Sequence, residues 1–293
     1  MLDLEQLITE KNAADTQWRE ERQTQRDTLT SIQEAGVVRI TSDPAVYARY
    51  LNMQGDNPTY SPGNIALIME QMPMATVFGT QDRWRNLGRT VTDIEMSKGA
   101  KIYARAPQGR GYVLADAYDI TQTEGKDLRR THLALGSKEM TTALRAVMNY
   151  SLVPFEVDNE LPVPAYYDAH NMVLAANPTD FPENESFAAI VAEVAHSRFH
   201  QKGYNRDYNR EESDLDAQSI SYIICRRFGV NRDLPDLSRV SELYQDWSVD
   251  SRKGILDGIQ DMSKMIGNSI ERDITPQQRT IPIPSRPSKR PAR

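Results

Sequence analysis

The sequence predicts an α+β fold, in which a small α+β first half is followed by a mostly helical second half. The chain has 293 residues, which is enough to bury one or two hydrophobic cores, and two domains are expected at this length. Residues 75–113 contain short runs of β-favouring residues separated by glycines, a pattern typical of strands. Longer segments of the second half instead repeat apolar residues at helical spacing.

Three helices and several short strands are expected in the first half. Pro58, Pro62 and Gly63 place a turn or loop over residues 56–63, because proline and glycine interrupt helices. A charged stretch over 124–130 marks the end of this half. The expected elements are a polar helix over 3–34, a helix over 44–53, a short apolar helix over 65–72, and strands that include 75–78 and 101–103.

Four helices and one strand are expected in the second half. The last helix, over residues 250–270, is indicated by Ile255, Ile259, Met262 and Ile266, which follow helical spacing. The other expected elements are a helix over 138–150, a proline-rich connector over 153–164, a strand over 172–175, and helices over 185–201 and 212–228 joined by a linker over 203–210. We therefore expect domains over 1–125 and 126–275, followed by a disordered basic tail over 276–293 that contains no acidic residue.

Composition and charge argue against several classes of protein. The apolar fraction of 39% and the charged fraction of 26% are ordinary for a soluble domain, and no apolar run approaches the roughly 20 residues that span a bilayer. The first ten residues carry three acidic side chains and lack the order of a signal peptide. Cys225 is the only cysteine, which excludes an intramolecular disulfide and a cysteine zinc cage. A cytoplasmic protein without a membrane partner is expected.

Basic residues gather in one stretch of a chain whose net charge is −6. That net charge counts against a generally basic nucleic-acid-binding protein. Between residues 83 and 110, however, seven basic residues stand against only Asp93 and Glu95. The stretch is therefore either a local nucleic-acid-binding strip or a solvated charged face. The seven residues are Arg83, Arg85, Arg89, Lys98, Lys101, Arg105 and Arg110.

Aromatic residues interleave with this basic strip. Single-stranded DNA is held by such a combination, because bases stack on aromatic rings while cations follow the phosphates. The alternative is that Tyr60 and Trp84 are core aromatics of a small α+β domain. The candidate DNA-binding residues are Tyr60, Asn64, Arg83, Trp84, Arg85, Arg89, Lys98 and Lys101.

Residues 40–125 also contain several short motifs in a fixed order. They are Tyr60-Ser61 with Asn64, Gln71-Met-Pro73 with Ala75-Thr76, Trp84, Gly88-Arg89 with Val91, Lys98-Gly99, and the run over 119–123. The ordered set resembles the N-terminal domain of ArdC-like antirestriction proteins and of related LtrC-like proteins of mobile elements. The resemblance implies binding of single-stranded DNA without sequence reading, in antirestriction or mobile-element transfer.

The second half contains an incomplete zinc-peptidase motif on an apolar helix. The complete motif is His-Glu-x-x-His, in which two histidines one turn apart bind zinc and the glutamate deprotonates the metal-bound water. Glu193 and His196 are present here, but Ala192 replaces the first histidine, and a methyl group cannot bind a metal. A degenerate zincin-like metallopeptidase domain is therefore expected.

A downstream segment, residues 214–225, resembles the family segment that supplies the third zinc ligand. The family carries acidic residues four apart in this segment, and the present chain carries Asp214 and Gln218. The resemblance does not decide which of the two positions holds the ligand. Gln218 is a poor zinc ligand, and Asp214 has a shorter reach than a glutamate.

Two interpretations of the remaining polar residues stay open. A shifted metal site would use His196 and His200, spaced i and i+4, together with Asp214. Alternatively, Glu193 and His196 belong to a buried hydrogen-bonded cluster with Asp214 or Tyr222, which avoids an unpaired buried charge. We expect the second arrangement, and therefore no zinc cofactor.

Three functions follow from these residues. The first is a single-stranded-DNA-binding protein with a catalytically inactive peptidase-like domain, and it is the one we expect. The second is an active metallopeptidase with a rearranged metal site and Glu193 as general base. The third is a protein-interaction scaffold with neither activity, in which the second domain or the basic tail contacts a protein partner.

Overall fold

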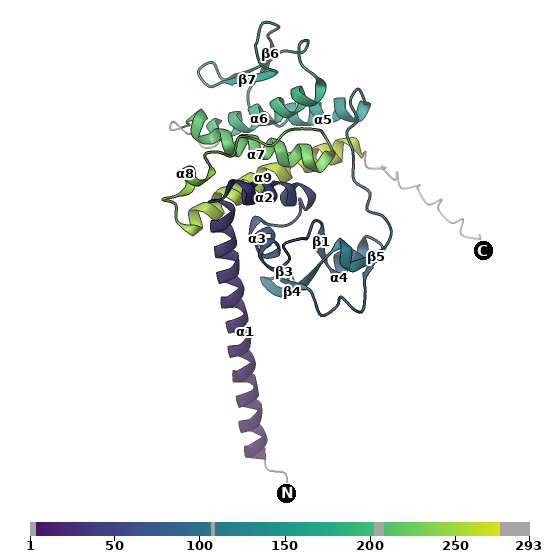
Figure 1. Cartoon of the computed structure of the whole chain (residues 1–293), viewed down its shortest axis with the longest axis vertical. Coiled ribbons are helices and arrows are strands. Elements are labelled where there is room, and N and C mark those ends of the chain that lie inside the picture. The colour runs from purple at the N-terminus through teal and green to yellow at the C-terminus, as the bar shows by residue number, and fades with distance from the viewer. Residues whose placement is uncertain (1–3, 107–108, 202–207, 276–293) are drawn as a thin grey trace, which may run out of the picture.

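The helices of this chain form most of its body, and small sheets lie at two sides of them (Figure 1). The computed structural model describes residues 4–106, 109–201 and 208–275. Helices and short strands occur in both halves of the described chain, which confirms the predicted α+β class. Within them, no helix is long and apolar enough to cross a membrane.

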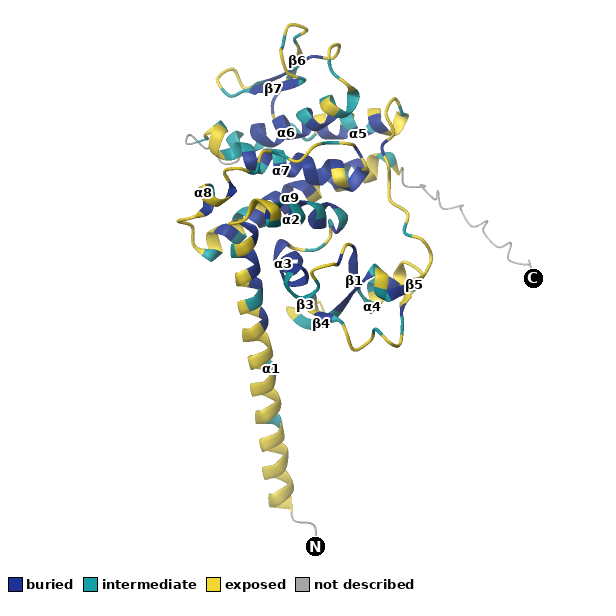
Figure 2. Cartoon of the chain, viewed as in Figure 1, coloured by how far each residue is buried: buried dark blue, intermediate teal, exposed yellow. Residues whose placement is uncertain are grey.

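Helix α1 (Leu4–Ile40) projects from the body as a long rod (Figures 1 and 2). Its buried residues begin at Leu29 and end at Ile40, and this end packs on α3. Arg252 of α9 anchors the turn that follows, donating from Nη1 to Thr41 Oγ1 at 3.0 Å and to Ser42 Oγ at 2.9 Å. The helix continues beyond the predicted end at residue 34, because its last turns are covered by tertiary contacts.

Side-chain caps define the next two helices. Asp43 accepts hydrogen bonds from the backbone of Ala45 and Val46 and begins α2 (Pro44–Asp56). Ser61 accepts from Asn64 N and begins α3 (Pro62–Gln71). Each helix has a proline in its first turn, where the missing N–H is harmless.

A three-stranded antiparallel sheet follows, in the order β1-β4-β3. Its strands are β1 (Phe78–Thr80), β3 (Ala100–Arg105) and β4 (Tyr112–Asp119), and a second pair joins β2 (Arg89–Val91) to β5 (Thr123–Gly125). Helix α4 (Gln81–Asn86) follows β1, and a 3-10 turn (Ile120–Gln122) follows β4. The first strand was predicted over 75–78 and in fact begins at Phe78.

Side-chain amides from helices pair with the open edges of this sheet. Asn64 donates to Tyr103 O at 2.8 Å and accepts from Tyr103 N at 3.0 Å, as a neighbouring strand would. Gln71, two turns further along α3, makes the same two bonds with Lys101, both at 2.9 Å. Asn57 does so at the other edge, with Thr76 O at 2.8 Å and Phe78 N at 3.0 Å. These amides satisfy backbone groups that an edge strand would leave unpaired.

The second half places a small sheet beside a layer of helices (Figure 1). Its strands are β6 (Phe155–Val157), β7 (Ala165–Asp168) and β8 (Val173–Ala176), with β8 parallel to β6 and antiparallel to β7. Strand β6 lies within the predicted proline-rich connector and β7 begins directly after it, and the sequence predicted neither strand. The helices are α5 (Lys138–Met148), α6 (Glu183–Gln201), α7 (Arg210–Phe228), α8 (Val240–Tyr244) and α9 (Val249–Ile274).

One large apolar cluster runs through both halves, because α2 packs on α7 and α3 contacts α9. The crossing of α2 and α7 is close at Gly55. A Cβ there would lie 2.6 Å from Arg226 Cγ and 2.7 Å from Arg226 Cβ, closer than Cβ atoms approach other atoms in proteins. The predicted tail over 276–293 and most of the predicted linker over 203–210 lie outside the described residues.

Candidate functional site

Helices α6 and α7 lie against each other and bring the residues of the incomplete zinc-peptidase motif to one place. Glu193 and His196 come from the buried face of α6, where they are 4% and 0% exposed. Asp214 comes from the second turn of α7. Ala192 is 1% exposed, so its methyl group fills core space at the position of the absent histidine.

Both oxygens of the Glu193 carboxylate are occupied. Arg210, at the start of α7, donates from Nη2 to Oε1 at 2.6 Å and from Nη1 to Oε2 at 2.9 Å. The backbone N–H of Tyr167 on β7 also donates to Oε2, at 2.8 Å. The Arg210 guanidinium lies 4.5 Å above the Tyr166 ring. A two-bond arginine–carboxylate pair is strong and directional, and with the Tyr167 N–H it fills three of the roughly four acceptor sites of the carboxylate.

His196 also has partners at both ring nitrogens. Its Nε2 lies 3.3 Å from Asp214 Oδ1, and its Nδ1 lies 2.9 Å from the hydroxyl of Tyr208. The hydrogen bond to His196 lowers the pKa of Asp214, against a smaller rise from burial. Burial raises the pKa of Tyr208 to about 12, so its hydroxyl stays protonated near neutral pH. Of the two partners expected for His196, Asp214 is present, whereas Tyr222 instead donates to Asn52 Oδ1.

The remaining polar residues do not complete a metal site. His200 Nδ1 is 2.7 Å from the Tyr167 hydroxyl, and its ring stacks on Tyr208 with centroids 5.0 Å apart. Gln218 donates to Asp214 Oδ1 and accepts from Arg232. Within the described ranges, no three His, Cys, Asp or Glu side chains are placed to hold a metal ion. The donor set therefore does not fit zinc, because a guanidinium is bound to the would-be catalytic glutamate and an alanine replaces one ligand.

A second candidate site is a groove of about 540 Å³ on the first half, closed on one side by α9. Three tyrosines line it: Tyr60 before α3, Tyr103 on β3 and Tyr112 at the start of β4. Arg105 and Lys264 add two positive charges to its walls. Neither of these two cations forms a salt bridge within the described part of the chain.

Arg105 and Tyr112 are direct cross-strand partners in the β3–β4 register. Residues in such a pair project from the same face of a sheet, with Cβ atoms about 5 Å apart. Tyr112 is 60% exposed, so its ring is accessible. This pair was missed by sequence reasoning, because the strand register that joins residues 105 and 112 is not visible in the basic strip alone.

Two of the predicted DNA-binding residues hold the fold together instead. Trp84 is 0% exposed, and its Nε1 donates to Tyr118 O at 2.9 Å, so its ring is a core aromatic and has no face open for a base. Asn64 is 7% exposed and its amide is engaged with the edge of β3. Trp84 therefore occupies the core position that was the alternative for it, and Asn64 is buried as well.

Much of the basic strip is already paired. Arg85 binds Asp82 at 3.0 Å, Lys98 binds Glu95 at 2.7 Å, and Lys101 binds Asp116 at 2.7 Å. All three cations remain more than half exposed, so these ion pairs are weak and a phosphate can compete with them.

Arg89 and Arg83 have more specific partners. Arg89 donates to Thr123 Oγ1 and O and to Lys126 O, which ties β2 to the segment after β5. Arg83 donates to Thr59 Oγ1 at 2.6 Å, and its guanidinium lies 5.1 Å over the Tyr60 ring. Tyr60 also packs on Phe78, with centroids 4.3 Å apart. Arg83 therefore lies against Tyr60, which lines the groove, whereas Arg89 ties β2 to β5 and to Lys126.

Two carboxylates from α9 oppose the cations of the groove. Asp257 and Asp261 line the same wall as Lys264, one turn apart from each other. Burial raises the pKa of Asp257, and the neighbouring Asp261 raises it further, against a lowering by Lys253. The groove is therefore mixed in charge, with its basic and aromatic side formed by β3 and β4.

Comparisons with known proteins give a likeness at the level of structure. No family model matches the sequence, and no curated protein matches it. Two crystal structures of the antirestriction protein ArdC from plasmid R388 are similar to the chain. The metal-free structure has a TM-score of 0.47 and 14% identity, and covers 83% of this chain and 97% of that one. The Mn(II)-bound structure has a TM-score of 0.48 and 14% identity, and covers 85% of this chain and 99% of that one. Neither likeness assigns an activity to this chain.

Proposed function

We propose that this chain binds single-stranded DNA without reading its sequence, and that its peptidase-like half does not hydrolyse peptides. The observation that carries the proposal is the groove in which Arg105 and Tyr112 stand side by side, with Tyr60 and Tyr103 along the same depression. Aromatic rings beside unpaired cations are what a sequence-tolerant single-strand site requires.

The DNA-binding surface that we propose differs from the strip expected from sequence. Tyr112 supplies the open ring and Arg105 and Lys264 supply cations that lack ion pairs in the described ranges. Tyr60 and Arg83 extend the surface, while Arg85, Lys98 and Lys101 contribute weaker charges from outside the groove.

The biological setting that we propose is antirestriction or the transfer of a mobile element. The support is the ordered set of motifs over residues 60–123, which resembles the ArdC-like domain. A strand coated by protein is protected from a nuclease by occlusion alone, and occlusion needs no hydrolytic centre. An inactive peptidase-like half fits this role, since Glu193 is held by Arg210.

The test is fluorescence anisotropy of a labelled oligothymidine titrated with the full chain at low and at moderate salt. We expect saturable binding that weakens as salt rises, because neutralised phosphates release counterions. A mixed-sequence strand of the same length should bind about equally. If no binding is detected at low salt, the proposal that this chain binds single-stranded DNA is wrong.

A further inference from the structure

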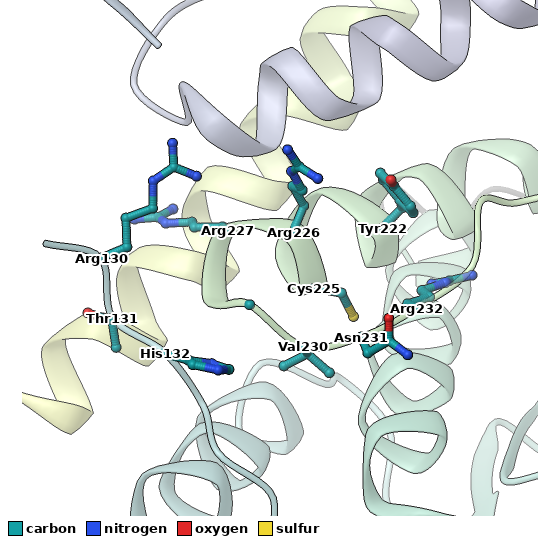
Figure 3. Close-up of a pocket in the computed structure, with 11 residues that line it drawn as sticks. Arg130, Thr131, His132, Tyr222, Cys225, Arg226, Arg227, Val230, Asn231 and Arg232 are labelled. Carbon is teal, nitrogen blue, oxygen red and sulfur yellow. The ribbon is translucent and has the colours of Figure 1, made fainter. Parts of the chain in front are cut away.

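A cavity of about 490 Å³ opens where the segment before α5 passes the end of α7 (Figure 3). It lies in the size range of small-molecule sites. Among the described residues that line it, four are arginines and none is an aspartate or glutamate. The arginines are Arg130 before α5, Arg226 and Arg227 in the last turn of α7, and Arg232 after it.

Nearby carboxylates offset only part of this charge. Asp56 of α2 is shared by two of the arginines, at 2.5 Å from Arg130 Nη1 and 2.9 Å from Arg226 Nη2. Glu271 of α9 pairs with Arg227 at 3.0 Å. Arg232 forms no salt bridge within the described ranges; its Nη2 donates to the neutral amide of Gln218. Two carboxylates therefore face four guanidinium groups.

Arg232 carries the strongest sign of an anion site. Its Nη1 is buried and has no hydrogen-bond partner among the described residues. Burial lowers the pKa of Arg232, because its charge is poorly hydrated there. A buried guanidinium nitrogen without an acceptor is unfavourable, and an anion bound beside Arg232 would offset its poorly hydrated charge.

The neighbouring thiol does not supply the balancing charge. Cys225 lies between Arg226 and Arg232 in the view of the cavity (Figure 3). It is 1% exposed, and burial raises its pKa to about 11, so it remains a neutral thiol near neutral pH. The excess positive charge of the cavity is therefore left for an anion from solution to balance.

We propose that this cavity binds a phosphate group, carried by a small molecule such as a mononucleotide or by the end of a nucleic-acid strand. Arginine suits phosphate because its planar fork offers two parallel donors to two oxygens. Arg232, which has no carboxylate partner among the described residues, is the principal cation, and Arg130 and Arg226, which share Asp56, add charge to the lining. The proposal does not rest on DNA binding in the groove, which lies on a different set of residues.

The test uses inorganic pyrophosphate as the probe in isothermal titration calorimetry with the full chain. We expect saturable binding at one site, weakened at least about tenfold by Arg232→Gln, since a hydrogen bond to a charged group is lost. Arg130→Gln should also weaken it, which keeps the test valid if the Arg232 variant fails to fold. Arg145→Gln, which removes the same charge from the exposed surface of α5, should leave the affinity unchanged.

Two further titrations separate the sources of the phosphate. A preference for a 5′-phosphorylated over a 5′-hydroxyl oligothymidine, lost in Arg232→Gln, would identify a strand end. Binding of thymidine monophosphate without such a preference would identify a free nucleotide. No saturable binding of pyrophosphate, or equal affinity in both cavity variants and the parent, would overturn the proposal.

Discussion

Arg210 and Glu193 form a two-bond ion pair, with Nη2–Oε1 and Nη1–Oε2 distances of 2.6 and 2.9 Å. The glutamate side chain is 6% exposed and the arginine side chain 32%. A carboxylate that would activate water in a working zinc peptidase is here a structural partner of a cation. The pair links the start of α7 to the middle of α6.

Breaking this pair should destabilise the fold. Arg210→Gln leaves Glu193 buried with an uncompensated charge, and we expect the free energy of unfolding to fall by about 2 kcal/mol or more. The double variant Arg210→Gln/Glu193→Gln should recover part of the loss. Urea unfolding of the four proteins of this cycle measures the coupling. Lys11→Gln, which breaks an exposed pair on α1, is the control and should change nothing measurable.

Zinc should not bind stoichiometrically. His196 is occupied by Asp214 and Tyr208, and Ala192 supplies no ligand. After incubation with zinc and desalting, we expect the chain to retain well under one equivalent by elemental analysis. A full equivalent that disappears in His196→Ala would contradict our proposal that the peptidase-like half is inactive.

Stability should decrease as the pH rises from mildly acidic to neutral. Burial raises the pKa of Asp216 from 3.8 to about 7, against a lowering by the hydrogen bond from Tyr244. Between these values the folded chain holds a proton that the unfolded chain releases, so the free energy of unfolding falls with rising pH and levels off above about pH 7.

Urea unfolding at several pH values measures this dependence. Asp216→Asn should flatten it, because an amide does not titrate. An equal slope in the parent and the variant would show that Asp216 ionises normally in the folded state.

The contact at Gly55 gives a stability test with an internal control. Gly55→Ala places a methyl group against the stem of Arg226 and should destabilise by about 1–3 kcal/mol. Gly254→Ala, within α9, meets nothing within 4 Å and should stabilise by about 0.5–1 kcal/mol, as helical glycine-to-alanine changes do. Thermal or urea unfolding should therefore show a lower stability for Gly55→Ala and a higher stability for Gly254→Ala than for the parent. A neutral Gly55→Ala would mean that α2 and α7 can move apart without loss.

The groove makes a prediction about single residues. Tyr112→Ala should weaken oligothymidine binding roughly 5- to 150-fold, equivalent to about 1–3 kcal/mol for one stacked base. Arg105→Gln should weaken it and also reduce the salt dependence. Tyr166→Ala is the matched control, because that tyrosine is 41% exposed but lies beside Arg210. An equal loss of oligothymidine affinity in all three variants would show that the groove is not the DNA-binding surface.

The helices of this chain were largely predictable, because their signals are local. Asp43 and Ser61 cap α2 and α3, and apolar spacing marks α9. Strands β6 and β7 were missed since segments of three or four residues are too short to show a period of two. The end of α1 was placed too early because its last turns owe their stability to α3 rather than to their own sequence.

The candidate sites were predictable only in part. Ala192 alone indicates the loss of a zinc ligand, and the pairing of His196 with Asp214 was anticipated from the motif. The partner of Glu193 was not anticipated, because Arg210 lies 17 residues away, at the end of a predicted linker that contains two arginines and two tyrosines. The sequence left Trp84 open between a core and a binding face, since an aromatic between arginines has the same local pattern in both, and its side chain is buried here.

The long α1 helix has a consequence for how the protein moves through solution. A helix of 37 residues is about 55 Å long, and none of its residues before Leu29 is buried. The protein therefore tumbles and diffuses as an elongated particle, with more friction than a sphere of equal mass. Gel filtration will report a larger apparent mass than light scattering does, and the excess should shrink when the rod is shortened.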